Sequence, residues 1–151
     1  PFFHGDLDTD FSPFANLADV KLQEFASDPY TVYQPLPNPN RYDDWIPRDT
    51  RTNDGGLVTV EVGRYQTNAW GLHDLHGNAA EWTASAYRPY PYDPDDGRDN
   101  PRSEGKKVVR GGSWRDRPNR ARSAFRLAYQ PWQGVYNVGF RVVCVSGNDG
   151  P

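Results

Sequence analysis

The sequence contains one cysteine, no methionine and no long hydrophobic run. A single cysteine excludes an intrachain disulfide and says little about the redox compartment. No stretch of these 151 residues approaches the length and apolar character of a membrane-spanning helix. The formal net charge is −3, whereas nucleic-acid binders are usually basic overall, so no nucleic-acid partner is expected.

Aromatic residues, glycine and proline are abundant instead. Aromatic residues make up 14% of the chain and hydrophobic residues 36%, and there are 14 glycines and 14 prolines. This composition predicts a single loop-rich globular domain over residues 1–151, whose core depends on aromatic side chains rather than on long aliphatic runs. Acidic residues are concentrated in the first two thirds of the chain, and arginines in the last third.

Residues 106–145 carry the clearest local signals. A short β-like run at 108–109 leads into a glycine pair at 111–112, which predicts a turn with positive φ or close backbone approach. Hydrophobic residues alternate over 138–143, which predicts a strand with one face in the core. Cys144 continues that alternation, so it is expected to be a buried, inert thiol.

The rest of the chain is predicted to be mostly irregular. A turn signal at 53–56 precedes an alternating run at 57–62, which predicts a strand. Residues 20–26 suit two helical turns, but the prolines that follow make 20–53 an irregular excursion or insertion. Its aromatic residues either pin it to the domain or form a binding surface. Residues 88–105 are predicted to be a solvated loop. Two tryptophans are expected to anchor the core: Trp70 and Trp82.

Four motifs in this order resemble one known family. They are GLHDLHGNAAEWT at 71–83, VVRGGSW at 108–114, RSAFR at 122–126 and NVGFRVV at 137–143. Together they resemble the formylglycine-generating enzyme family, also called the sulfatase-modifying factor domain, and the resemblance covers roughly residues 1–145. It implies an α+β, C-type-lectin-like fold that is loop-rich, with short strands and few helices. The chain begins partway into the family domain, so the N-terminal portion of that domain is expected to be missing.

The resemblance also implies two calcium sites. In the first, the Asn16 side chain, the Leu17 carbonyl, the Asp54 carboxylate and the Gly56 carbonyl are the expected ligands. Calcium prefers six to eight oxygen ligands, and these groups supply oxygen only. A plain Asx-turn remains the alternative role for Asp54.

The second implied calcium site lies within GLHDLHGNAAEWT. Its expected ligands are the carboxylates of Asp74 and Glu81 and the carbonyls of Gly77 and Ala79. A loop with little regular structure gains from such an ion, because the ion satisfies oxygens that no β-ladder would satisfy. Asn78 is expected to be a structural hydrogen-bonding residue rather than a catalyst.

Copper is not expected in this chain. Copper-dependent members of the family have two cysteines shortly after the RGGSW turn, and these bind Cu(I) as soft thiolates do. The resemblance puts those positions at Asp116 and Ala121, although Ser113 matches the family pattern. No residue is therefore assigned a catalytic role. The residues that line the former active-site turn are Ser113, Trp114, Arg115 and Asp116.

The arginines allow two interpretations. They either form an anion-binding groove or tie carboxylates and carbonyls together within the fold. Arg110, Arg126 and Arg141 occupy positions of the family motifs and are expected to be structural. The arginines that border the former active-site turn, and that could present charge to a ligand there, are Arg115, Arg117, Arg120 and Arg122.

His73 and His76 have the spacing of a zinc half-site only if they lie on a helix with a third ligand. His4 is the one other histidine, and the pair straddles the implied calcium turn, so a transition-metal site is disfavoured.

The function expected from these features is a calcium-stabilised binding or assembly domain that does not generate formylglycine. Its partners are expected to be the rest of its own polypeptide, a protein complex, or a protein or glycan ligand. An extracytoplasmic or secreted location, in a multidomain or secreted bacterial protein, is favoured. Two alternatives remain: an oxidoreductase whose metal centre lies in the missing part or in a partner, and a carbohydrate-binding, lectin-like module.

Overall fold

A computed structural model describes residues 2–22 and 51–144, so most of the predicted excursion at 20–53 lies outside the described residues. The described chain forms one small sheet and much ordered loop. No helix in those two ranges is long and apolar enough to cross a bilayer. The elements are β1 (Ala80–Ala86), β2 (Lys107–Arg110), α2 (Pro118–Ala121), β3 (Leu127–Tyr129) and β4 (Val138–Phe140).

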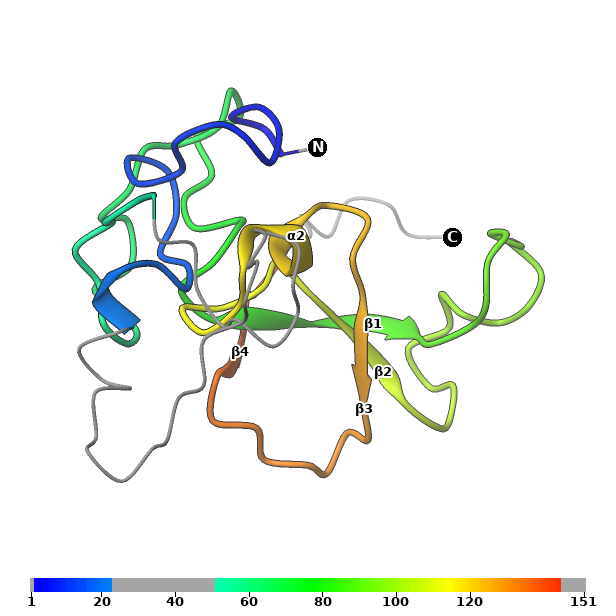
Figure 1. Ribbon diagram of the computed structural model, residues 1–151. Coiled ribbons are helices and arrows are strands. Elements are labelled where there is room, and N and C mark those ends of the chain that lie inside the picture. The colour runs from blue at the N-terminus through cyan, green and yellow to red at the C-terminus, as the bar shows by residue number, and fades with distance from the viewer. Residues whose placement is uncertain (1, 23–50, 145–151) are drawn as a thin grey trace, which may run out of the picture.

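The four strands form a mixed sheet in the order β3-β2-β1-β4 (Figure 1). β2 pairs antiparallel with both β1 and β3, and β4 pairs parallel with β1. Trp82 lies opposite both Val109 of β2 and Phe140 of β4. Short strands, the four-residue helix α2 and long connections make the described residues a loop-rich α+β fold, as the sequence predicts.

The N-terminal segment and the segment before β1 lie side by side at one end of the sheet (Figure 1). Side chains join them. The Asn16 amide donates to the Val58 carbonyl (2.8 Å), and Asn78 receives a hydrogen bond from the Val60 N–H (2.9 Å) and donates one to the Val60 carbonyl (3.2 Å). The prediction of a strand at 57–62 is wrong, because these side-chain amides satisfy backbone groups that a neighbouring strand would otherwise bond.

The hydrophobic core is built largely from loop residues. One cluster joins Phe2, Phe11, Ala15 and Leu17 to Ala121 of α2. A second cluster joins the N-terminal segment to Trp114, which follows β2, and its members are Ala18, Leu22 and Trp114. Both clusters therefore hold the N-terminal segment against the region around α2. In the sheet, Val108 and Val109 are buried, as predicted for the β-like run.

The predicted core face of residues 138–143 is wrong. Phe140 is 77% exposed and Val142 is 82% exposed, and Cys144 is exposed rather than buried. β4 is an edge strand of only three residues that pairs with β1 alone. The alternating pattern identified a strand, but the pattern could not show whether another layer covers that edge.

The two tryptophans have different environments. Trp82 on β1 is half-buried and meets Tyr129 edge to face, with ring centroids 6.2 Å apart. Trp70 is 83% exposed, so its predicted role as a core anchor is wrong. Trp70 lies in a turn where its N–H and that of Leu72 both bond the Asn68 side chain.

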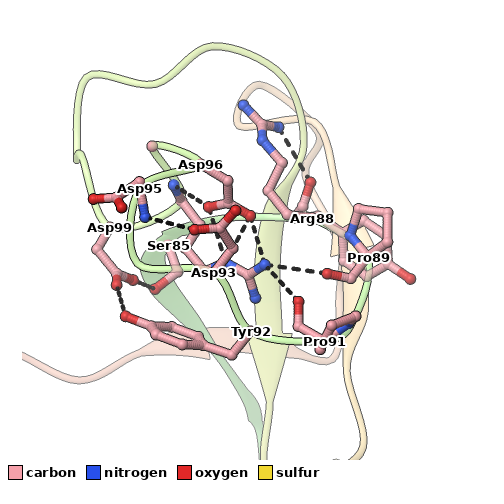
Figure 2. A network of polar contacts seen from close by, with 12 residues as sticks. Ser85, Arg88, Pro89, Pro91, Tyr92, Asp93, Asp95, Asp96 and Asp99 are labelled. Atoms are coloured by element: carbon pink, nitrogen blue, oxygen red, sulfur yellow. Dashed lines mark hydrogen bonds and ion pairs between the residues drawn. The ribbon is translucent and has the colours of Figure 1, made fainter.

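The loop between β1 and β2 extends from the sheet on the side away from the N-terminal segment (Figure 1). It is organised around Arg98, which is only 5% exposed. The guanidinium donates to Asp96 at 2.5 Å and to the carbonyls of Pro89 (3.1 Å) and Pro91 (3.3 Å), and it lies over the Tyr92 ring at 4.8 Å. Figure 2 shows this network around Asp96, Pro89 and Pro91. The predicted solvated loop thus has a buried cation at its centre.

Replacing Arg98 with methionine is expected to lower the free energy of unfolding, because two carbonyls and one carboxylate lose their donor. Urea unfolding measures the change. The matched control is Arg102→Met in the same loop, since Arg102 is exposed and bonds only through its backbone N–H in the contacts described. Equal losses for the two variants would contradict the central role of Arg98.

Candidate functional site

The first implied calcium cluster is assembled from two segments. The Leu17 N–H donates to the Asp54 carboxylate (2.8 Å), which also accepts the Gly56 N–H (2.7 Å). Asp19, which sequence reasoning did not include, accepts the Asp54 N–H and is fully buried. Asn16, Leu17, Asp54 and Gly56 thus lie together as expected, and Asp19 joins them. The Gly56 N–H bond to the Asp54 side chain also shows that Asp54 makes an Asx-turn, while its calcium role stays a prediction.

Two observations show that this cluster suits a hard cation. Asn16 is fully buried, yet its side-chain oxygen accepts no hydrogen bond in the described residues. Burial, reinforced by the nearby Asp19 carboxylate, raises the pKa of Asp54 to about 6, although the N–H groups of Gly56 and Leu17 oppose that shift. A cation would satisfy the orphaned amide oxygen and stabilise the ionised form of the buried carboxyl. The residues present therefore fit calcium.

The second implied cluster lies in the turn before β1. Asp74, Ala79 and Glu81 share the lining of a pocket of about 580 Å³, and one Asp74 oxygen is buried without a hydrogen-bond partner in the described chain. The other Asp74 oxygen accepts the Gly63 N–H at 2.8 Å. Asp74 itself has a φ of +55°, in the left-handed region, which the neighbouring turn holds in place. The orphaned oxygen again fits a cation.

Arg141 is a further member of the second cluster. Its Nη2 donates to Glu81 at 2.7 Å and to the His73 carbonyl at 2.9 Å, and its Nε reaches both Glu81 oxygens. This ion pair raises the pKa of Arg141. Arg141 is structural, as predicted, but it engages the carboxylate that the resemblance assigns to calcium. An ion in this pocket would share Glu81 with Arg141.

Gly77 links the two clusters. A Cβ at this position would lie 2.2 Å from the Asn16 carbonyl oxygen, and the Asn78 N–H donates to the same oxygen at 2.7 Å. Asn78 also bonds the N–H and the carbonyl of Val60 through its side chain, which confirms its predicted structural role. The turn at 77–78, in the second cluster, therefore packs directly against the backbone of Asn16 in the first cluster.

The former active-site turn is closed by Asp116. This carboxylate accepts the Ser113 hydroxyl (2.6 Å) and the Ser113 N–H (2.9 Å), and Asn137 donates to the same hydroxyl oxygen (2.8 Å). Ser113 is completely buried, so its hydroxyl is not offered to a substrate. Gly111 and Gly112 have φ values of +87° and +71°, which confirms the predicted turn.

Ala121, at the second position where the resemblance expects a cysteine, is packed in the core. Ala121 is fully buried, and a Cβ on Gly112 would come within 2.8 Å of its methyl group. Asp116 and Ala121 therefore have structural roles in this chain: one bonds the turn and the other fills the space beneath it. Trp114 is buried beside this turn, whereas Arg115 is exposed.

The arginines separate into two groups. Arg110 donates to the Ser123 carbonyl, and Arg126 donates to the Arg88 carbonyl and lies 3.8 Å over the Tyr90 ring, so both are structural as predicted. Arg122 donates its Nε to the Asn119 carbonyl (2.7 Å), so it also has a structural contact, within its own turn. The arginines that line a pocket of about 400 Å³ beside the turn are Arg115, Arg117 and Arg120.

The three described histidines do not form one metal site, although the His4 and His76 rings lie 5.7 Å apart, centroid to centroid. His73 Nδ1 lies 2.7 Å from the Tyr65 carbonyl, and His76 Nδ1 lies 2.7 Å from the Ala121 carbonyl. His4 instead stacks on the Phe14 ring, with centroids 5.1 Å apart. Across residues 2–22 and 51–144, no three His, Cys, Asp or Glu side chains group closely enough to hold a metal. Each of the two calcium-type clusters brings together two described carboxylates, Asp19 with Asp54 and Asp74 with Glu81, so neither forms such a group of three.

Acid is expected to destabilise the N-terminal segment through His4. Burial, reinforced by His76, lowers the pKa of His4 to about 4, and burial also lowers the pKa of His76. A lowered folded-state pKa means that the unfolded chain binds protons first, so stability falls as pH drops from about 6.5 to about 4. The slope from one such group is at most about 1.4 kcal/mol per pH unit. Urea unfolding across this range should show a shallower slope for His4→Phe, and an unchanged slope would contradict the assignment.

Comparison with known proteins agrees with the motifs. The model of the sulfatase-modifying factor enzyme 1-like domain matches residues 20–145. Two curated relatives, from Mus musculus and Bos taurus, are each named inactive C-alpha-formylglycine-generating enzyme 2. The mouse protein is 35% identical over 119 residues, covering 72% of this chain and 34% of the relative. The bovine protein is 35% identical over 123 residues, covering 75% and 36%.

The chain thus spans about a third of the length of these curated relatives. Among solved structures, Treponema denticola variable protein 1 is 31% identical, with a TM-score of 0.48, over 56% of this chain and 31% of that protein. The family match covers most of the chain. It includes the second calcium-type turn and the former active-site turn, and it includes Asp54 and Gly56 of the first calcium-type cluster but not Asn16 or Leu17. The chain belongs to the sulfatase-modifying factor enzyme 1-like, or formylglycine-generating-enzyme-like, domain family.

Proposed function

We propose that this chain is a formylglycine-generating-enzyme-like domain that binds a ligand or partner and is stabilised by calcium. The binding role rests on one observation: the residues at the two expected copper-ligand positions, Asp116 and Ala121, are both engaged in the fold. The Asp116 carboxylate bonds Ser113 twice, and Ala121 is packed in the core, so neither position offers a soft ligand to copper. The names of the two curated relatives, which call those proteins inactive, support the same proposal.

The calcium part of the proposal rests on two orphaned oxygens. Asn16 and Asp74 each keep one buried oxygen without a hydrogen bond among the described residues, and each lies beside carboxylate or carbonyl oxygens. A buried acceptor left unsatisfied costs about 1–3 kcal/mol, which an ion at that point would remove. The chain around both oxygens has little regular structure, so an ion would also hold the loops together.

Elemental analysis of the purified protein after dialysis tests both parts. We expect one or two equivalents of calcium and no stoichiometric copper or iron. Asp54→Ala should remove calcium from the first cluster, and Asp74→Ala from the second. Asp95→Asn is the matched control, since Asp95 is an exposed carboxylate outside both clusters.

Stoichiometric copper or iron, accompanied by oxygen uptake, would overturn the binding role and favour an oxidoreductase of the same superfamily. Calcium content that is unchanged in both alanine variants would overturn the assignment of the two clusters.

A further inference from the structure

One pocket is lined by aromatic side chains from three segments of the chain. Phe2 and Phe3 come from the N-terminal segment, Trp70 from the turn before β1, and Trp82 from β1. The pocket has a volume of about 550 Å³, within the usual range for small-molecule sites. Trp70 is 83% exposed, so its indole offers apolar surface to a bound molecule. These rings favour a ligand that has a flat apolar part.

Asn68 adds an unused hydrogen-bond donor to this lining. It is buried, with 8% of the residue exposed. Its Oδ1 accepts the N–H groups of Trp70 (2.9 Å) and Leu72 (3.0 Å), and two donors at that oxygen fix the orientation of the amide. The Nδ2 atom donates to no described residue and is not enclosed by the protein, so both of its N–H groups are open to a ligand.

His76 adds an unused hydrogen-bond acceptor to the same lining, and only 5% of it is exposed. Phe2 meets its ring edge to face at 5.1 Å between centroids, and Phe3 stacks on it at 5.6 Å, so the imidazole is held in place. Its Nδ1 lies 2.7 Å from the Ala121 carbonyl, which only accepts, so Nδ1 carries the proton of the neutral ring. Nε2 is then an acceptor, and it bonds no described residue.

We propose that this pocket binds a small planar aromatic molecule that carries a carbonyl and an N–H group, as an aryl amide does. The ring packs against the indoles of Trp70 and Trp82. The carbonyl accepts a hydrogen bond from Asn68 Nδ2, and the N–H donates one to His76 Nε2. The inference rests on the proposed binding function and names the ligand class for it.

Isothermal titration of the full chain with benzamide tests the proposal. The titration is run at a pH of about 8, because histidine is neutral well above its ordinary pKa of about 6.5. Three analogues each change one feature of the ligand. N,N-dimethylbenzamide has no N–H, benzoate has a charged oxygen in place of the amide nitrogen, and acetamide has no ring. We expect saturable binding of benzamide and weaker binding of each analogue.

Two variants test the assigned contacts. Asn68→Asp keeps an oxygen for the two N–H groups of its turn but replaces the donor with a second oxygen, so it should weaken benzamide about tenfold or more. Trp70→Leu should weaken benzamide about two- to tenfold, the usual contribution of an aromatic pair. Because Trp70 is largely exposed, this variant should keep the melting temperature of the unchanged protein.

Each variant has a matched control outside the pocket. Asn100→Asp changes an exposed asparagine whose side-chain oxygen also accepts a backbone N–H, and Trp132→Leu removes an indole that is 80% exposed. Neither control should change the affinity for benzamide. Circular dichroism checks that Asn68→Asp is folded, and if it is not, Trp70→Leu and the three analogues decide the question.

Three results would each overturn the inference: unchanged benzamide affinity in folded Asn68→Asp or in Trp70→Leu, equal binding of benzamide and N,N-dimethylbenzamide, or no benzamide bound at about 10 mM. Metal content measured on the same sample separates the two proposals. Calcium without benzamide binding would end this inference alone, whereas stoichiometric copper or iron would end the proposed function.

Discussion

Removal of calcium is expected to lower the melting temperature of this protein by about 5–10 °C for each occupied site. A ligand present at a hundred times its Kd stabilises the folded state by about 2.7 kcal/mol. For a chain of this size, each kcal/mol corresponds to about 2–4 °C. The physical source is the pair of buried oxygens, on Asn16 and Asp74, that accept no hydrogen bond from the described residues and that an ion would satisfy. Differential scanning calorimetry with and without EGTA measures the shift.

Variants separate the two clusters in the same experiment. In Asp54→Ala or Asp74→Ala, the shift caused by EGTA should shrink, because one site no longer contributes. The two contributions are expected to be coupled rather than additive, since Gly77 and Asn78 of the second turn rest on the Asn16 carbonyl of the first. EGTA-treated protein that melts at the same temperature as the calcium-loaded protein would contradict the calcium proposal.

Gly77→Ala is expected to cause the largest loss of any single methyl addition in the described chain, above about 4 kcal/mol. The new Cβ would lie 2.2 Å from the Asn16 carbonyl oxygen and 2.8 Å from its carbon, and both are backbone atoms that no rotamer change can move. The Gly77 N–H also donates to the Gly111 carbonyl (2.9 Å), so a backbone shift there would disturb the former active-site turn. Urea unfolding, with circular dichroism as the readout, measures the loss.

Gly71→Ala is the control for backbone strain. Gly71 has a φ of +74°, close to the +79° of Gly77, but a Cβ there would meet no described heavy atom within 4 Å. It should therefore cost only about 1 kcal/mol, the penalty for placing a side chain in the left-handed region. Similar losses in the two variants would mean that the close approach of Gly77 to Asn16 does not matter.

Several structural elements follow directly from local sequence patterns. Val108 and Val109 form the buried middle of β2, and Gly111 and Gly112 form a turn in the left-handed region. These predictions succeeded because strand pattern and glycine conformation depend on neighbours in the chain. The prediction at 57–62 failed for the opposite reason, since amide side chains from Asn16 and Asn78 satisfy that backbone and no strand pairs with it.

In the candidate site, too, local motifs predicted some residues, whereas contacts between distant residues decided others. The ordered motifs predicted two calcium-type turns, and the structure brings the Asn16, Leu17, Asp54 and Gly56 positions of the first together, while calcium binding itself stays a prediction. The motifs did not indicate Asp19, which accepts the Asp54 N–H, or the competition of Arg141 for Glu81. The residues in those pairs are 35 and 60 positions apart, and no short pattern contains both members.

The amino-acid sequence by itself determined the family and the loop-rich α+β class, because both depend on which residues stand in an ordered motif. Tertiary structure alone decided that Asp116 closes a buried turn, that Trp70, Phe140 and Cys144 are exposed, and that three arginines share a pocket with two tyrosines. Burial and pocket composition arise from segments that are distant in the chain and meet only when it folds, so one-dimensional periodicity does not contain them.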